Sequence, residues 1–87
     1  MYMVVERFVA GARAVYERAD ERGRMLPPGL RYVDSWVDER LERCFQLMET
    51  DEPAPLEQWI AAWSDLVAFE VFPVIGSAEA ARRALGD

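Results

Sequence analysis

Hydrophobic and polar residues alternate along four stretches of this chain and recur with a helical period along two others. The alternating stretches, which predict half-buried strands, are Tyr2–Val9, Leu30–Val37, Arg43–Glu49 and Ala68–Ile75. The helical period covers Ala12–Arg22 and Leu56–Asp65. The order strand, helix, strand, strand, helix, strand predicts a ferredoxin-like α+β fold, with one antiparallel sheet of four strands and two helices on one face.

Glycine and proline residues mark the ends of the predicted elements. Gly23 is placed to end the first helix in a left-handed conformation. Pro53 and Pro55 fit the first turn of the second helix, where the backbone N–H groups have no partner in any case. Because proline cannot donate to a sheet ladder, Pro73 predicts that the last strand lies at an edge of the sheet.

The chain shows neither repeats nor a linker-like composition. We therefore expect residues 1–87 to form a single domain, with a short helical tail over residues 77–87. Ser77 is the expected cap of a helix at Ala78–Leu85 in that tail.

The two middle strands predict a hairpin, and its register decides which side chains share a face. Pairing of Val37 with Arg43 places six side chains together: Tyr32, Asp34, Trp36, Cys44, Gln46 and Met48. A slip of one residue would exchange these partners. Large aromatic and polar side chains on one face are typical of a small-molecule pocket, and equally of an interface with a second subunit. Both interpretations stay open at this point.

Trp59 and Trp63 lie four residues apart on the apolar stripe of the second helix, so they can wall a ligand cavity or simply pack in the core. With them, the predicted ligand-binding residues are Tyr32, Trp36, Cys44, Gln46, Met48, Trp59 and Trp63. The chain has no histidine to activate Cys44, so we expect this thiol to act as a small buried hydrophobe.

Three carboxylates lie inside predicted strands: Glu6, Asp34 and Glu70. A carboxyl group desolvated by aromatic neighbours has a raised pKa and can serve as a general base. Asp34 or Glu6 is the candidate base, with Tyr32 as a hydrogen-bond donor, and two carboxylates on the adjacent first and last strands can form a pair. The plainer interpretation is that these acids pair with Arg7, Arg31 or Arg43.

Composition narrows the classes of partner. Hydrophobic residues make up 52% of 87 residues, more apolar surface than two short helices can cover, which predicts an oligomer. The net charge of −6 argues against nucleic acid and anionic membranes as partners. No apolar run approaches the roughly 20 residues of a membrane span, and the chain opens on a strand rather than a signal peptide, so we expect a cytoplasmic protein.

The absence of histidine and the single cysteine exclude much of the usual catalytic chemistry. They remove the Ser-His-Asp triad, the usual haem ligand, most zinc sites and any Cys-x-x-Cys motif. No glycine-rich phosphate-binding motif is present either. We therefore expect neither a metal nor a cofactor.

Six segments carry a further signal: Met3–Phe8, Ala14–Tyr16, Gly23–Pro27, Tyr32–Val37, Arg43–Glu49 and Trp59–Trp63. Together these segments resemble a bacterial family catalogued as domain of unknown function 3303. The resemblance extends from Met3 to Ala81, nearly the whole chain. It is weakest at Phe8–Gly11, where the family pattern carries more polar residues.

The resemblance implies a dimeric α/β barrel, in which two ferredoxin-like protomers bring their sheets face to face with the helices outside. It implies no catalytic residues, because the family has no established activity. The wider superfamily includes cofactor-free monooxygenases, haem-dependent enzymes and small isomerases, and the haem branch requires a histidine that this chain lacks. Fold-level analogy alone does not choose among functions.

Three hypotheses follow. The first is a homodimer that binds an apolar or aromatic small molecule in a cavity on its sheet. The second is a cofactor-independent monooxygenase or isomerase. The third is a structural or regulatory dimer without a ligand.

Overall fold

The computed structural model describes residues 1–86 and contains the predicted elements in the predicted order. The strands are β1 (Tyr2–Phe8), β2 (Arg31–Val37), β3 (Arg43–Glu49) and β4 (Val67–Pro73). The helices are α1 (Ala12–Arg22), α2 (Pro53–Trp63) and α3 (Ser77–Ala84). Asp87, the last residue of the expected tail, lies outside the described residues.

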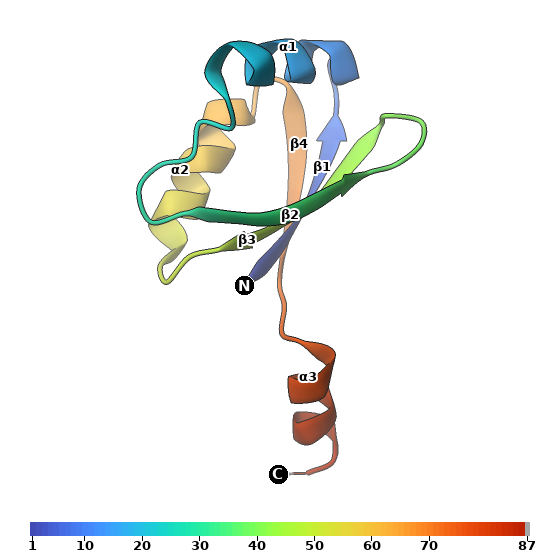
Figure 1. Cartoon of the computed structure of the whole chain (residues 1–87), viewed down its shortest axis with the longest axis vertical. Helices are drawn as coiled ribbons and strands as arrows, with labels where there is room; N and C mark the ends of the chain where they lie inside the picture. Colours follow the sequence, from blue (N-terminus) through green and yellow to red (C-terminus); the bar gives the residue numbers. More distant parts are fainter. Residues whose placement is uncertain (87) are drawn as a thin grey trace.

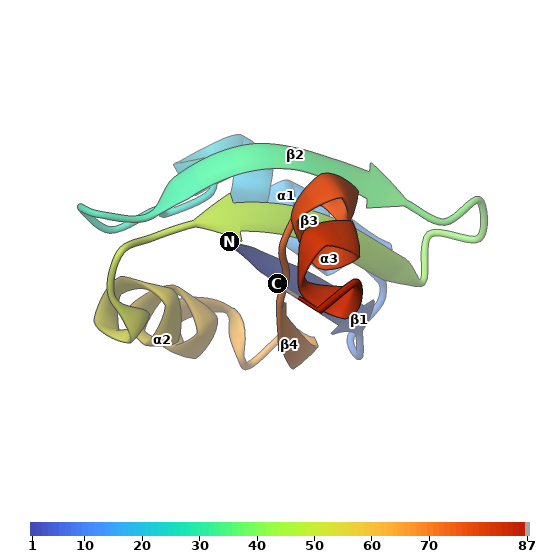
Figure 2. The same ribbon diagram turned by 90° about the horizontal axis from the view of Figure 1, so that it is seen from below.

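The strands form one antiparallel sheet in the order β2-β3-β1-β4. Helices α1 and α2 lie on the same side of this sheet (Figures 1 and 2). The predicted ferredoxin-like α+β fold is therefore confirmed. The edge position of β4, which ends at Pro73, is confirmed as well.

The core lies between the sheet and the two helices. Val4 from β1 and Met48 from β3 are fully buried there. Helix α2 contributes Leu56, Trp59 and Trp63, all buried, which confirms the apolar stripe read from its sequence. The sheet face that these side chains cover is called the helix-covered face below.

The helix ends follow the predicted signals in most places. Gly23 ends α1 with a φ of 66°, a backbone conformation that a side chain would strain. Pro53 is the first residue of α2. The prediction that Ser77 caps the last helix is wrong, because Gly76 occupies the cap position and Ser77 is already helical.

The predicted register of the β2–β3 hairpin is wrong by one residue. Val37 pairs with Cys44 rather than with Arg43, and Trp36 pairs with Phe45. The ladder also shifts between Tyr32 and Asp34, which leaves Val33 as the extra residue of a β-bulge. This bulge keeps Tyr32 opposite Met48 although residues 34–37 of β2 lie on the face opposite to the predicted one.

The correction moves two predicted residues to the other side of the sheet. Cys44, Gln46, Met48 and Tyr32 share the helix-covered face as predicted, together with Ser35 and Val37. Asp34 and Trp36 do not share that face, because they pair with Leu47 and Phe45 on the opposite side.

That opposite side, called the open face below, is rich in apolar side chains: Met3, Val5, Trp36, Phe45, Leu47 and Phe72. None of the helices described covers it (Figure 1). Trp36 is 52% exposed, Phe72 47% and Phe45 38%. Contiguous apolar surface of this kind marks an interaction site more often than a free surface.

Helix α3 stands away from the rest of the structure at the end of β4 (Figure 1). It contains no buried residue, and Leu85 just beyond it is 84% exposed. Glu79 pairs with Arg82 and Arg83 on its surface. Within residues 1–86 no helix is long and apolar enough to cross a membrane.

Candidate functional site

A cavity of about 280 Å³ lies between the helix-covered face of the sheet and the two helices. Its floor comes from three neighbouring strands: Glu6 of β1, Cys44 and Gln46 of β3, and Ser35 and Val37 of β2. Its walls are largely apolar and come from Val15, Tyr16 and Ala19 of α1 and from Trp59 and Trp63 of α2.

A charged contact fixes the distance between the two helical walls. The guanidinium of Arg18 in α1 donates to both carboxylate oxygens of Asp65, just after α2, at 2.8 and 2.6 Å. The same guanidinium lies over the ring of Trp63, 5.4 Å from its centroid. Bidentate geometry of this kind fixes orientation as well as distance.

The segment after α1 closes one side of the cavity and is tied to α2 through its backbone. The carbonyl oxygen of Arg24 accepts a hydrogen bond from Nε1 of Trp59 and another from Nε1 of Trp63, each at 3.0 Å. Gly23 and Met25 flank this carbonyl with φ of 66° and 58°, so the chain turns sharply here. The turn aims the Arg24 carbonyl at both indoles.

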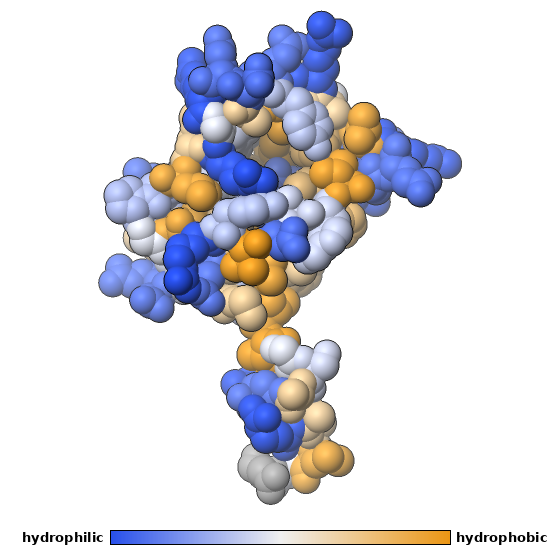
Figure 3. Space-filling view, in the orientation of Figure 1, coloured by the Kyte–Doolittle hydropathy of each residue, from blue (hydrophilic) through white to orange (hydrophobic). Residues whose placement is uncertain are grey.

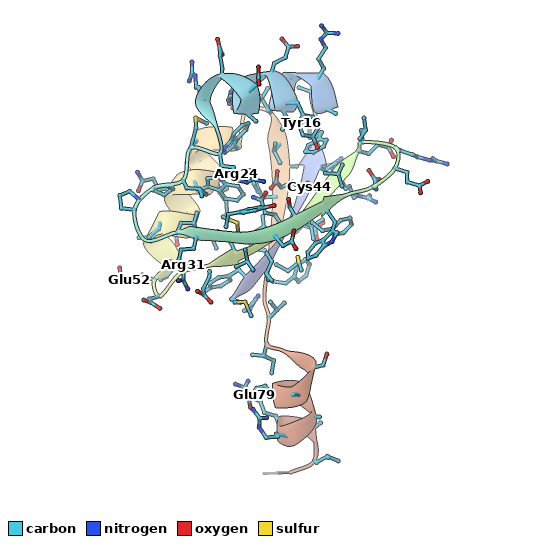
Figure 4. The ribbon with its side chains drawn as sticks, in the orientation of Figure 1. Tyr16, Arg24, Arg31, Cys44, Glu52 and Glu79 are labelled. Atoms are coloured by element: carbon cyan, nitrogen blue, oxygen red, sulfur yellow. The ribbon has the colours of Figure 1, made fainter. Side chains whose placement is uncertain are left out.

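The side chain of Arg24 crosses to the sheet at the mouth of the cavity. Its guanidinium carbon lies 3.6 Å from the ring centroid of Tyr32, in a cation–π arrangement. The hydroxyl of Tyr32 is hydrogen-bonded to that of Ser35 at 2.6 Å. Tyr16, Arg24 and Cys44 lie together in the space between α1 and β2 (Figure 4).

Glu6 is the most unusual group of the cavity floor. The residue is only 7% exposed, and its Oε2 atom has no hydrogen-bond partner among residues 1–86. Burial raises the pKa of Glu6 from an ordinary 4.5 to about 7, although the positive charge of Arg24 lowers this pKa in part. The carboxyl group is therefore divided between its charged and neutral forms near neutral pH.

Cys44 faces the same cavity as an unreactive thiol. Burial, and next the nearby charge of Glu6, raise the pKa of Cys44 to about 12. A thiol of this pKa is protonated at neutral pH and is a poor nucleophile. Among the residues that the structure describes, no three His, Cys, Asp or Glu side chains are placed to hold a metal ion.

The structure places the predicted ligand-binding residues in different parts of the fold, and only some of them line the cavity. Cys44, Gln46, Trp59 and Trp63 line the cavity. Met48 is fully buried, and Tyr32 lies at the edge of the cavity under Arg24. Trp36 stands on the open face, on the far side of the sheet.

The candidate acids are separated in the same way. Glu6 lines the cavity, whereas Asp34 and Glu70 belong to the open face. Glu6 and Glu70 therefore cannot form the carboxylate pair that adjacent strands allowed. Asp34 instead accepts a hydrogen bond from the backbone N–H of Ser35 at 2.8 Å.

Several residues that line the cavity were not identified as site residues from the sequence, and Arg24 and Ser35 are two of them. Arg24 follows a helix end, where an arginine is expected to favour the helix dipole, so nothing marked it as part of a cavity. Ser35 was assigned to the wrong face by the register error. Three residues before it, Tyr32 carries the hydroxyl to which Ser35 bonds, and the bulge is what places these two residues on one face.

The backbone carbonyl of Arg24 accepts hydrogen bonds from two indoles, and substitution of the two tryptophans tests whether both bonds form in solution. Each single substitution, Trp59→Phe or Trp63→Phe, leaves the carbonyl one indole partner, so each costs about 1 kcal/mol. The double variant leaves the Arg24 carbonyl without either of its indole donors. We expect its loss of unfolding free energy to exceed the sum of the singles by about 1 kcal/mol in urea denaturation. Strict additivity would show that the two bonds are not shared in solution.

These features define a class of protein: a small ferredoxin-like α+β fold in which a buried carboxyl group lies on the floor of a cavity between the helices and the sheet. The chain belongs to the family described as Domain of unknown function (DUF3303), whose model matches residues 1–85. The resemblance seen in the sequence is thereby confirmed. No curated protein and no solved structure matches the chain.

Proposed function

We propose that this protein binds a small apolar or aromatic molecule in the cavity between its helices and its sheet. One observation carries the proposal: the cavity combines apolar walls with the buried carboxyl group of Glu6, whose Oε2 atom has no hydrogen-bond partner among residues 1–86. An unpartnered polar group in a core is costly, and proteins retain such groups mainly where a ligand or a reaction uses them.

The size of the cavity limits the ligand. A volume of about 280 Å³ lies at the lower end of the range for small-molecule sites. An apolar cavity of about 150 Å³ already accepts benzene. A ligand of one or two fused rings therefore fits, with its polar atoms directed to Glu6 and Gln46 on the floor and its ring against Trp59 and Trp63.

The positions of the three tryptophans provide an internal control for a binding experiment. Trp59 and Trp63 line the cavity, whereas Trp36 lies on the open face. In a titration with 2-indanone followed by ¹H–¹⁵N NMR, we expect the indole signals of Trp59 and Trp63 to move and that of Trp36 to stay. Equal movement of all three, or of none, would contradict a ligand site in this cavity and favour a dimer without a ligand.

A filling substitution sharpens the test. Ala19 lines the cavity from α1, and Ala19→Leu places three more carbon atoms in it. We expect 2-indanone to bind more weakly by about 1–3 kcal/mol. Ala61→Leu, on the exposed side of α2, is the matched control and should leave affinity unchanged.

We further propose that two copies of the chain pair through the open face. Trp36, Phe45 and Phe72 support this proposal, because each is large, apolar and more than a third exposed. Hydrophobic side chains also gather below β2 and along the connection from β4 to α3 (Figure 3). An isolated helix as short as the eight residues of α3 is marginal in water, so a second copy that contacts it would stabilise it.

A further inference from the structure

We propose that the cavity is a proton-transfer site for small aromatic ketones, in which Glu6 takes a proton from the carbon beside the carbonyl and Gln46 donates a hydrogen bond to the carbonyl oxygen. The inference rests on the ligand-binding function proposed above and adds a reaction and a substrate class to it.

The register of the sheet places the two groups at a suitable separation. Glu6 pairs with Cys44, and Val4 pairs with Gln46, so Glu6 and Gln46 are diagonal neighbours on adjacent strands. The Cβ atoms of such neighbours lie about 7 Å apart. Both side chains line the cavity, and both residues are buried, at 7% and 6% exposure. A carbonyl group and its adjacent carbon span the gap between them.

The side chains of Glu6 and Gln46 have complementary roles in this reaction. An amide N–H is a neutral donor, which can stabilise negative charge as it develops on oxygen in a site shielded from water. A carboxylate oxygen that accepts no hydrogen bond keeps its basicity. The Oε2 atom of Glu6 meets this condition, because it has no partner among residues 1–86.

The step balances without a co-reactant. The carboxylate of Glu6 forms an O–H bond with the proton as the C–H bond breaks. The electron pair of that bond becomes the C=C bond of an enolate, and the carbonyl π electrons move to the oxygen, which accepts the hydrogen bond of Gln46. When the Glu6 carboxyl group exchanges its proton with solvent before reprotonation, return of a solvent-derived proton to the same carbon completes the exchange, and return of a proton to a different carbon completes an isomerisation.

The groups that face Glu6 keep it usable as a base near neutral pH. Burial raises the pKa of Glu6, and Arg24 from the segment after α1 limits the rise, giving about 7. Cys44 on β3 stays protonated at this pH, and the pKa of Tyr16 on α1 is raised above its ordinary 10. Helix α2 contributes Trp59 and Trp63, which do not titrate, to the cavity. Of these groups, Glu6 is therefore the one whose charge changes around pH 7.

The experiment follows deuterium uptake by 2-indanone in D₂O, because its methylene groups exchange through the enolate. We expect the protein to accelerate uptake above the buffer rate, and Glu6→Gln to lower the added rate by about 100-fold or more. The wild-type rate should rise with pH and level off above about 7, as Glu6 ionises. Glu57→Gln, at an exposed position of α2, is the matched control and should exchange like wild type.

The outcomes separate the reaction from binding. If 2-indanone moves the Trp59 and Trp63 indole signals but exchanges at the buffer rate, the ligand site stands and the reaction is refuted. If Glu6→Gln retains the wild-type rate, Glu6 is not the base and the inference fails. If 2-indanone moves neither indole signal, both the binding function and the inference fail. Indane, which has the same rings without the carbonyl, should inhibit exchange by competition when the reaction occurs in the cavity.

Discussion

Replacement of Trp36 by aspartate is expected to convert the proposed homodimer into a monomer of 10.0 kDa. Trp36 lies on the open face and is 52% exposed, so it packs against no core that its loss would damage. Tryptophan at the centre of an interface typically contributes about 2–4 kcal/mol, and an added carboxylate would also have to be desolvated. We expect the dimer dissociation constant to rise by on the order of 30- to 1,000-fold, as measured by analytical ultracentrifugation.

A matched substitution tests whether the location matters rather than the added charge. Leu41 is exposed to the same degree, at 53%, but it lies in the turn between β2 and β3, outside the open face. Its φ of 57° is one that aspartate tolerates well. Leu41→Asp should therefore leave the dimer intact. A wild-type chain that sediments as a monomer, or equal weakening by both variants, would argue against pairing through this face.

The Trp36→Asp variant also distinguishes the two roles that the sequence allowed for Trp36, in a ligand pocket or in a subunit interface. An aromatic strand residue is compatible with a pocket or with an interface, and the register decides between the two faces. Since the cavity lies behind the sheet from Trp36, Trp36→Asp should leave the response of the Trp59 and Trp63 indoles to 2-indanone unchanged.

The sequence predicted the elements well because each carries local signals. The apolar stripe of α2 and the prolines at its start specify a helix without reference to the rest of the chain. Gly23 marks the end of α1 in the same way. The ferredoxin-like topology followed from the order of these elements, because few ways exist to pack them into a single covered sheet.

The register of β2 could not be predicted from local signals. Tyr32, Asp34 and Trp36 alternate with Val33, Ser35 and Val37, and each set contains both polar and apolar residues. Either set can face a core, so the alternation does not show which set of β2 residues faces the helices. The bulge at Val33 then takes Tyr32 from the first set and Ser35 from the second and places them on one face.

The residues of the candidate site were likewise predictable only where they carry a local sequence signal. Glu6, Cys44, Gln46 and the two helical tryptophans were identified from strand and helix periodicity alone, and the structure brings them around one cavity. Arg24 was missed because its main role is carried by a backbone carbonyl, which every residue possesses. Such a contact depends on where a loop lies in space, and no residue type marks it in advance.

The buried carboxyl group of Glu6 should make the stability of the protein depend on pH in an unusual direction. The pKa of Glu6 is about 7 in the folded chain and 4.5 ordinarily. Between these values the folded chain binds a proton that the unfolded chain releases. The contribution of Glu6 to stability is therefore fully present below pH 4.5 and is lost as pH rises through 7.

The neutral variant Glu6→Gln removes this dependence. One pKa unit corresponds to about 1.4 kcal/mol, so the free energy of unfolding of Glu6→Gln relative to wild type should increase by about 2–3 kcal/mol between pH 5 and pH 8. Urea denaturation at both pH values and one protein concentration measures the change, and the fixed concentration removes the effect of dimer dissociation.

The comparison with wild type at each pH isolates Glu6 from the other acids. Asp38 and Asp65 have lowered pKa values, through backbone N–H donors to Asp38 and through Arg18 beside Asp65. Their contributions have the opposite sign, since they are lost as pH falls, but they are present in both proteins and cancel. Glu57→Gln should show no such increase. A difference between Glu6→Gln and wild type that stays constant from pH 5 to pH 8 would mean that Glu6 is solvated and has an ordinary pKa, and it would contradict the pH dependence expected of the proposed reaction.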